Sequence, residues 1–416
     1  MRGVVYCLIG ALLLSPAQVR ALDVGSDGSD GTLNPSSNVN IDLDLAVTGS
    51  WNSPGNGSGV YDPDRWAVVF KYSSVNIASG RTVSFTNHPS GAPVIWLVQG
   101  NVTIAGTINI KGSNYDNTGA FAAGGPGGFR GGAAYLTTSQ GSAGFGPGGG
   151  LYNPGGNPGN NGGGGGYGTA GAGTGGGSTY GNPRVLPLIG GSGGAGHGGY
   201  PWGGGAGGGA ILIASGGTLT VSGSVDATGG SGSASGPYYS GGGSGGGIRL
   251  IGDTITGAAS GLIASGGGPT NGAGGAGRIR IEGNTVSLTG SSTPAYTMLA
   301  PLENSGTLVV VWPPAGSPSL RVLTVAGQTV PADPRARFVT PGDVVINTSG
   351  NVEAIVEATS MPITWTVKVR VNLRNGDESI VTATRVDGDS VSSRWSATLP
   401  AFPQSDFVAI QARASQ

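Results

Sequence analysis

The most restrictive feature of this sequence is that runs of glycine enclose short segments of β type. In "GGGAILIASGGTLTVSGSVDATGG", residues 207–230, both ends are nearly pure glycine, while the middle alternates apolar and small polar residues with a period of two. Glycine weakens an isolated strand because it loses the most backbone freedom on folding and offers no side chain to pack. Such a chain must gain its stability from stacked short strands or from close approach of backbones.

The strand-like segments recur along the chain. When residues 95–112 are aligned with residues 211–229, four positions correspond: Val102, Ile104, Gly106 and Ile108 fall on Leu219, Val221, Gly223 and Val225. Strands this short cannot form a sheet alone, but stacked copies can pair at ~4.8 Å per layer and share one apolar interior. We therefore expect a short right-handed parallel β-helix, since parallel connections are right-handed. Gly106, Gly223 and Gly290 are expected at its corners, where a tight bend or a positive φ suits glycine.

Three glycine-rich inserts are expected on one edge of this β-helix, at residues 113–209, 230–247 and 267–277. Residues 121–210 contain 40 glycines, nine aromatic residues and two arginines, with no Asp, Glu or Lys. One interpretation is a mobile loop, whose closure costs only about 4 kcal/mol. Another is a bundle of extended glycine helices whose backbones pack closely and hydrogen-bond to one another. A calcium-binding nonapeptide array is excluded, because each of its turns needs an Asp.

The composition changes near residue 301. Residues 301–416 contain 19 of the 41 charged residues, and segments of β type recur between turn signals such as Asn375-Gly376 and Asp387-Gly388. This pattern predicts an immunoglobulin-like (Ig-like) β-sandwich. The predicted fold class is thus all-β: a short right-handed parallel β-helix with a large Gly-rich insert over residues 22–300, followed by an Ig-like β-sandwich over residues 301–416.

Residues 1–21 have the pattern of a secretory signal peptide. Arg2 precedes an apolar run at residues 4–14, and small residues end the segment at Ala21. Cys7, the single cysteine, lies inside this segment, so we expect no disulfide and no thiolate chemistry in the mature chain. No later apolar stretch approaches 18 residues, so no membrane span is expected. The sequence predicts a secreted protein that is extracellular or lies at the cell surface.

The charged residues do not suggest nucleic-acid binding or catalysis. A net charge of −1 with 10% charged residues argues against a nucleic-acid partner. A polysaccharide lyase or hydrolase needs clustered carboxylates or carboxylates beside a cation, and the candidates Asp116, Asp226 and Arg249 form no repeated column. The alternation of Arg278, Arg280 and Glu282 on one strand is typical of a solvated outer face.

Metal and cofactor chemistry has no sequence signature either. His88 precedes a proline, and His197 stands among glycines, so the two histidines make no metal pair. No GxSxG, HExxH, P-loop or CxxC motif occurs. We expect no catalytic residue, no cofactor and no metal site, and hence no enzyme.

Aromatic residues of the large insert are the remaining candidates for a binding site. Tyr152, Tyr167, Tyr200 and Trp202 could form a surface on which sugars stack, or could instead pin the insert to its own scaffold. The leading hypothesis is a non-enzymatic surface or matrix protein with an adhesive or structural coat role. Its expected partners are glycans or cell-surface and matrix components, and self-association stays open.

Two other hypotheses remain. The first is a β-helix that binds or cleaves polysaccharide along its rungs, in the manner of a lyase or hydrolase. The second is an ice or surface binder, which would need flat, repeated threonine columns, whereas only short sets such as Thr218 and Thr220 occur.

Three segments carry a resemblance: "GVYDPDRWAVVFKYSSVNI", "NHPSGAPVIWLVQGNVTI" and "GGAGGGAILIASGGTLTVSGSVDATGG". Over about residues 25–290 the chain resembles uncharacterised secreted glycine-rich parallel β-helix proteins of environmental bacteria. The resemblance implies a β-helix and export. It assigns no functional residue.

Overall fold

A computed structural model describes residues 22–115, 121–134, 141–153, 160–300, 302, 308–335, 340–373, 378–402 and 407–415. The expected signal segment, residues 1–21, and the candidate Asp116 lie outside the described residues. The described chain is all-β, and its helices are the single 3-10 turns η1 (Leu43–Leu45), η2 (Ala259–Gly261) and η3 (Thr270–Gly272). Within these ranges, no helix is long and apolar enough to cross a membrane.

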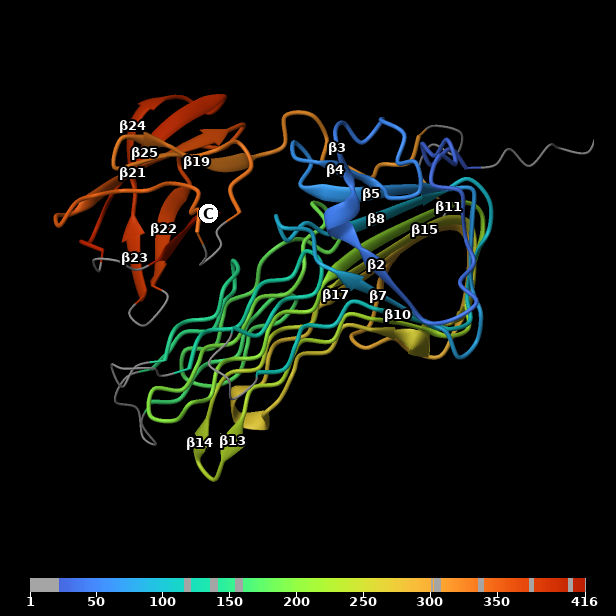
Figure 1. Cartoon of the computed structure of the whole chain (residues 1–416), viewed down its shortest axis with the longest axis horizontal. Helices are drawn as coiled ribbons and strands as arrows, with labels where there is room; N and C mark the ends of the chain where they lie inside the picture. Colours follow the sequence, from blue (N-terminus) through green and yellow to red (C-terminus); the bar gives the residue numbers. More distant parts are fainter. Residues whose placement is uncertain are drawn as a thin grey trace, which may run out of the picture.

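Two sheets of mainly parallel strands form the first part of the structure (Figure 1). The larger sheet curls around an apolar core, and only its β4–β5 pair is antiparallel. Its strands are β1 (Thr32–Leu33), β3 (Val47–Thr48), β4 (Val60–Asp62), β5 (Ala67–Tyr72), β6 (Ser74–Ile77), β8 (Val94–Val98), β9 (Val102–Ile104), β11 (Ala210–Val221), β15 (Gly247–Ala258), β17 (Arg278–Thr289) and β18 (Thr297–Leu299). The smaller sheet contains β2 (Val39–Asp42), β7 (Thr82–Thr86), β10 (Thr107–Asn109), β12 (Ser224–Asp226) and β16 (Leu262–Ile263).

Residues that the sequence alignment places in register are cross-strand partners. Ile104 of β9 pairs with Val221 of β11, and Ile108 of β10 pairs with Val225 of β12. All four side chains are buried in one core that both sheets enclose. Segments more than 100 residues apart in the chain therefore lie side by side. The large insert, residues 113–209, extends away from the sheets after β10 and returns to them at β11.

The corner glycines serve close packing more than backbone conformation. Only Gly290 has a positive φ, of 74°. A Cβ on Gly223 would lie 1.9 Å from the carbonyl oxygen of Gly106, and a Cβ on Gly106 would lie 2.2 Å from that of Arg81. The expectation of a bend or positive φ is thus met at Gly290, while contact between successive layers explains Gly106 and Gly223.

The central strands of the larger sheet are buried on both faces. In β8, Trp96 faces the core between the two sheets, whereas Ile95 and Leu97 face an outer apolar layer. That layer is completed by side chains from distant segments: Leu22, Val24, Trp51, Val311 and Trp312. Burial on both faces explains why β8 is an uninterrupted apolar run instead of an alternating one.

The glycine-rich inserts form an ordered array of extended segments that run side by side to a far tip (Figure 1). We call the described parts of residues 110–153, 160–209, 227–246 and 264–277 the glycine lattice. Successive amides of one segment donate to three different neighbours and return to the first every third residue. The pairs along one segment are Gly204 N–Gly132 O, Gly205 N–Gly241 O, Ala206 N–Ser113 O, Gly207 N–Phe129 O, Gly208 N–Ser244 O and Gly209 N–Ile110 O. A period of three with bonds only to neighbours is the geometry of extended helices with three residues per turn.

Each inner segment of the lattice is enclosed by others. Residues 204–209 exchange backbone hydrogen bonds with six stretches of chain, which are 110–115, 121–125, 127–134, 190–196, 227–231 and 241–247. The spacing excludes side chains, since a Cβ on Gly205 would lie 2.0 Å from the carbonyl oxygen of Gly230. Of the two interpretations of the large insert, the extended-helix bundle is the one that its described residues adopt.

The C-terminal residues form two antiparallel sheets over a shared apolar core. One contains β19 (Ser319–Val325), β20 (Gln328–Thr329), β21 (Val352–Thr359), β24 (Thr384–Gly388) and β25 (Ser392–Leu399), and the other contains β22 (Thr366–Leu373), β23 (Glu378–Thr382) and β26 (Val408–Ser415). In β22, Val367 and Val369 are buried and Lys368 is exposed, so apolar and charged residues of this strand alternate between its two faces.

The C-terminal sheets pack directly on the glycine lattice. Arg413 donates from Nη1 to the carbonyl oxygen of Pro147 (3.0 Å) and to Oγ of Ser178 (2.7 Å). The Arg130 guanidinium lies 4.0 Å from the ring centroid of Phe145, and burial lowers the pKa of Arg130 to about 10. The apolar contact consists of Phe121, Phe129, Phe145, Phe407 and Ala409.

Replacing a lattice glycine should destabilise the protein far more than replacing a glycine in open space. Gly205→Ala forces the backbone of residue 230 to move, which should cost about 3 kcal/mol and lower the unfolding midpoint by roughly 3–5 °C. Gly350→Ala is the matched control, because its Cβ would have only Thr348 Oγ1 nearby, at 3.9 Å. Thermal unfolding followed by circular dichroism compares them, and equal midpoints would contradict the close-packed lattice.

Candidate ligand-binding site

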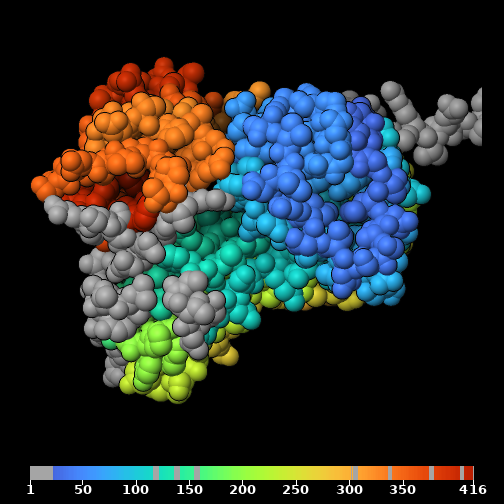
Figure 2. Space-filling model, viewed as in Figure 1, coloured from blue at the N-terminus to red at the C-terminus, as the bar shows by residue number. Residues whose placement is uncertain are grey.

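Three stretches of the lattice meet at its far tip. The hairpin of β13 (Ala234–Ser235) and β14 (Tyr238–Tyr239) lies at this end in Figure 1, and the tip projects as a lobe in Figure 2. Asn161 fixes the hairpin, because its Oδ1 accepts from the Tyr239 amide (2.8 Å) and its Nδ2 donates to the Pro237 carbonyl (3.2 Å). The Gly198 amide donates to the Asn160 carbonyl (3.0 Å), and this bond holds the loop at residues 197–202 against the other two stretches.

Four ring side chains form what we call the tip cluster: His197, Tyr200, Trp202 and Tyr238. The Tyr200 and Trp202 rings stack with centroids 4.4 Å apart and planes 11° apart. The Tyr238 ring lies 5.5 Å from that of Tyr200 and is tilted by 54°. Tyr200 is 38% exposed and Tyr238 37% exposed, whereas Trp202 is half-buried. The cluster therefore presents two aromatic side chains to solvent on a stacked base.

His197 supports the loop that carries this stack. Its Nδ1 accepts hydrogen bonds from the amides of Gly199 (2.8 Å) and Tyr200 (3.1 Å), so Nδ1 carries no proton and the neutral ring is protonated at Nε2. The ring is 1% exposed and meets Trp202 and Tyr238 edge to face, at 5.5 and 6.0 Å. Burial lowers the pKa of His197 below its ordinary value of 6.5.

The structure brings together three of the four aromatic residues singled out in the sequence. Tyr200 and Trp202 belong to the tip cluster, and half-buried Tyr152 lies beside it, donating from its hydroxyl to Asn160 Oδ1 (2.9 Å). Tyr167 is elsewhere and is fully buried, with its ring 4.6 Å from that of Tyr180. The inclusion of Tyr167 in a solvent-facing stacking surface is therefore wrong, because lattice packing encloses it.

Tyr238 is a site residue that the sequence reasoning missed. It lies in the second insert, 36 positions after Trp202, and only the lattice brings the two inserts together. The available signal was the pair Tyr238-Tyr239 after Gly236-Pro237 in a stretch of small residues. A turn that carries bulky aromatic residues among serines and glycines is a candidate for contact with a ligand.

The tip carries no ionic group. No Asp, Glu, Lys or Arg occurs in residues 141–153, 160–166, 196–203 or 231–240, and neutral His197 adds no charge. The surface offers aromatic faces, tyrosine hydroxyls and asparagine amides. Such a surface can stack on flat apolar faces and exchange neutral hydrogen bonds.

The acid and the cation considered for catalysis have structural partners. Asp226 forms an ion pair with Lys111 (2.9 Å) and accepts from the amide and hydroxyl of Thr228 (3.1 and 2.6 Å). Arg249 is 2% exposed and donates through Nε and Nη2 to the two carboxylate oxygens of Glu282, at 3.1 Å each. The side chains of Asp226 and Arg249 are therefore both bound by other side chains of the fold.

The strand with alternating charges is not a solvated outer face throughout. Glu282 is only 8% exposed and accepts from both Arg249 and Arg280, the latter at 3.1 Å. Arg249 also donates to the carbonyl oxygen of Val310 (2.8 Å), so the segment around Val310 covers these side chains. The prediction of a solvated face is wrong for Glu282, because a distant segment packs over the strand.

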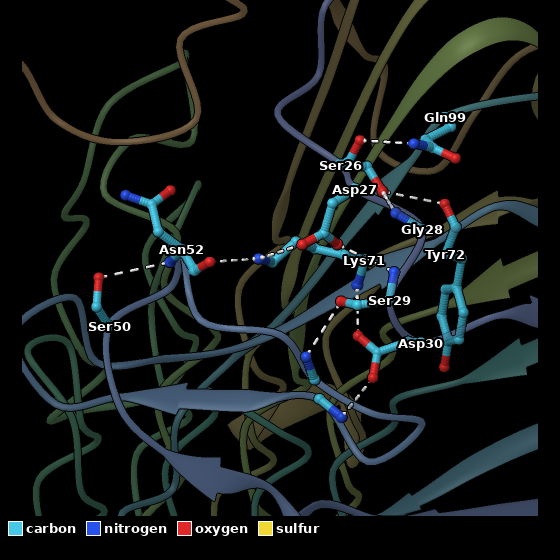
Figure 3. A network of polar contacts seen from close by, with 12 residues as sticks. Ser26, Asp27, Gly28, Ser29, Asp30, Ser50, Asn52, Lys71, Tyr72 and Gln99 are labelled. Atoms are coloured by element: carbon cyan, nitrogen blue, oxygen red, sulfur yellow. Dashed lines mark hydrogen bonds and ion pairs between the residues drawn. The ribbon is translucent and has the colours of Figure 1, made fainter.

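A third polar network anchors the start of the described chain (Figure 3). The Asp30 carboxylate accepts from the amides of Gly57 and Gly59 (2.9 Å each) and of Lys71 (2.7 Å). The Lys71 ammonium donates to the Asn52 carbonyl (2.9 Å). These bonds hold the loop before β4 against β5, so the network serves the fold.

Comparisons with protein-family models, with curated proteins and with solved structures found no match. Among the described residues, no group of three or more His, Cys, Asp or Glu side chains is placed to hold a metal ion. The tip cluster is the candidate site that the geometry supports best.

Acidification should disorganise the tip cluster through His197. Its pKa is lowered in the folded protein, so the unfolded chain binds more protons as the pH falls below 6.5, and the free energy of unfolding should fall with it. Protonation of Nδ1 also removes both of its hydrogen bonds. NMR titration of the imidazole should give a midpoint below 6.5, together with a change in tryptophan fluorescence.

His197→Asn is the matched variant for this titration. The Asn Oδ1 can accept from the same two amides, but the side chain does not titrate. The variant should keep the loop and lose this component of the pH dependence. A His197 midpoint at or above 6.5 in the natural protein would contradict the burial argument.

Proposed function

We propose that this chain is a non-enzymatic, exported surface or matrix protein that adheres to glycans through the tip cluster. The single observation that carries the proposal is the pair of exposed tyrosines, Tyr200 and Tyr238, held on a hydrogen-bonded and uncharged support far from the sheets. Aromatic faces presented in this way suit the apolar faces of sugar rings. The expected signal segment and the glycine-rich composition support export.

The proposal includes a finer description of the scaffold. We regard the parallel sheets as a short right-handed parallel β-helix and the C-terminal sheets as an Ig-like β-sandwich. The paired positions of β9, β11 and β15 support the first assignment, and two antiparallel sheets over one core support the second. In this description the β-helix is the base from which the lattice extends.

Rigidity is the physical advantage of this arrangement. A binding loop that is ordered before it meets its ligand loses little conformational entropy on binding. The lattice orders the tip through backbone hydrogen bonds between segments, and His197 Nδ1 orders the loop of Tyr200 and Trp202. Repeated weak contacts from many copies on a surface would then add through multivalency.

The alternative of polysaccharide cleavage has less support from the described residues. Asp226 of β12 and Arg249 of β15 belong to different sheets, and each has a structural partner. We therefore assign the tip to binding and not to turnover.

Removal of an exposed tip ring should weaken glycan binding. With residues 22–416 and the glycans selected by an array, Tyr200→Ala and Tyr238→Ala should each weaken binding by ~10-fold, because stacking area is lost. Met298→Ala is the control, since Met298 is 52% exposed and lies on β18, outside the tip. Calorimetry gives the affinities.

Product assays on the bound glycans decide between binding and cleavage. New reducing ends or unsaturated products that disappear in an Asp226→Asn variant would overturn the proposal in favour of an enzyme. Binding that is unchanged in both tyrosine variants would overturn the assignment of the tip.

A further inference from the structure

A second candidate site lies at the base of the lattice, where the third insert returns to β17. A cavity of about 190 Å³ opens there. It is lined by Gly168, Thr169, Pro183, Ala276, Gly277, Arg278, Ile279, Pro294, Ala295 and Thr297. The lining contains one charged side chain, the half-buried Arg278, and no carboxylate.

Arg278 is held in place but is not neutralised. Its Nε and Nη2 donate to the carbonyl oxygen of Tyr180, at 3.2 and 2.8 Å. Its guanidinium lies 5.5 Å from the ring centroid of Tyr167, which is buried. Nη1 has no hydrogen-bond partner in the part of the chain that the structure describes, so N–H donors remain available.

The other cations of the parallel sheets differ from Arg278. Each of the other cations that lie within strands of the two sheets has a described carboxylate within 4 Å: Lys71 of β5 has Asp27, and Arg249 of β15 and Arg280 of β17 share Glu282. Arg278 is in no such pair among the described residues. A guanidinium that is fixed, partly removed from water and without a counter-charge favours an anionic ligand.

We propose that this cavity binds a small oxyanion, either a sulfate or a carboxylate group, through Arg278. The N–H groups of Nη1 and the second N–H of Nη2 can donate to two oxygens of such a group. The volume is below the ~300 Å³ at which pockets for whole drug-sized ligands begin, so the cavity suits a charged substituent and not an entire sugar ring. Thr169 accepts from the Ala276 amide (2.8 Å), which leaves its hydroxyl proton available to the anion.

This site is independent of the tip cluster. The tip is uncharged and would bind the neutral faces of sugar rings, whereas the cavity would bind negatively charged groups. The oxyanion could be free in solution or carried by an acidic glycan, and both share the same recognition by Arg278.

The test titrates residues 22–416 with sodium sulfate in a buffer without other oxyanions and follows the backbone amide NMR signals of Gly168 and Gly277. A parallel titration uses a sulfated disaccharide, and the unsulfated disaccharide is its control. We expect saturable shifts with sulfate and with the sulfated sugar, and none with the unsulfated sugar. Tighter binding of the sulfated sugar than of sulfate identifies a glycan-borne group, and equal binding identifies a free anion.

Two variants and one control make the result specific to Arg278. Arg278→Gln and Ala295→Glu should each weaken sulfate binding by at least ~10-fold, the first by removing the cation and the second by placing a carboxylate in the cavity. Arg184→Gln removes an equal but exposed charge next to Pro183 and should leave the affinity within ~2-fold.

Ala295→Glu decides the question if Arg278→Gln does not fold, because Ala295 is exposed and its substitution keeps both bonds to Tyr180. Shifts that do not saturate, or an unchanged affinity in Ala295→Glu, would overturn the proposal. Neither result depends on glycan binding at the tip.

Discussion

Neighbouring backbones in the glycine lattice approach so closely that a carbonyl oxygen occupies the place of a side chain's first carbon. At Gly131, Gly204 and Gly205 that oxygen would lie within 2.0 Å of a Cβ. The same approach lets each amide reach a carbonyl of an adjacent segment, so hydrogen bonding and the requirement for glycine have one cause. Glycine usually brings backbone freedom. Here it has the opposite effect, since a segment such as 204–209 is bonded to six surrounding stretches of chain.

The chemistry of the tip follows from this packing. Backbone groups satisfy one another inside the lattice, so its interior needs few polar side chains and its length adds almost no charge. Some bulky residues, such as Tyr167, are enclosed by lattice packing, whereas Tyr200, Trp202 and Tyr238 lie at the tip, where segments end or turn. The lattice thus separates an aromatic, uncharged surface from the charged C-terminal sheets, although both belong to one chain.

Sequence patterns predicted the strands better than the lattice or the site. The register of Ile104 with Val221 was visible because apolar alternation and a corner glycine recur together. The three-residue period of the lattice was not visible, because Gly, Ala and Ser all occur in it and the contacts are between backbones. Tyr167 and Tyr200 have similar local sequences, yet one is enclosed and the other is exposed. Only the arrangement of inserts in space separates them, and it also explains why Tyr238 was missed.

The outer layer over the larger sheet has a consequence for the order in which the protein can mature. Leu22 and Val24 are present from the start, but Val311 and Trp312 follow the last residue of β17, Thr289, by more than 20 positions. At ~5–20 residues per second, translation reaches them roughly 1–5 s after β17 is made. During that interval Ile95, Leu97 and Leu212 have only part of their cover. For a few seconds the growing chain therefore exposes apolar surface through which it can associate with other chains. The segment around Trp312 then covers that surface.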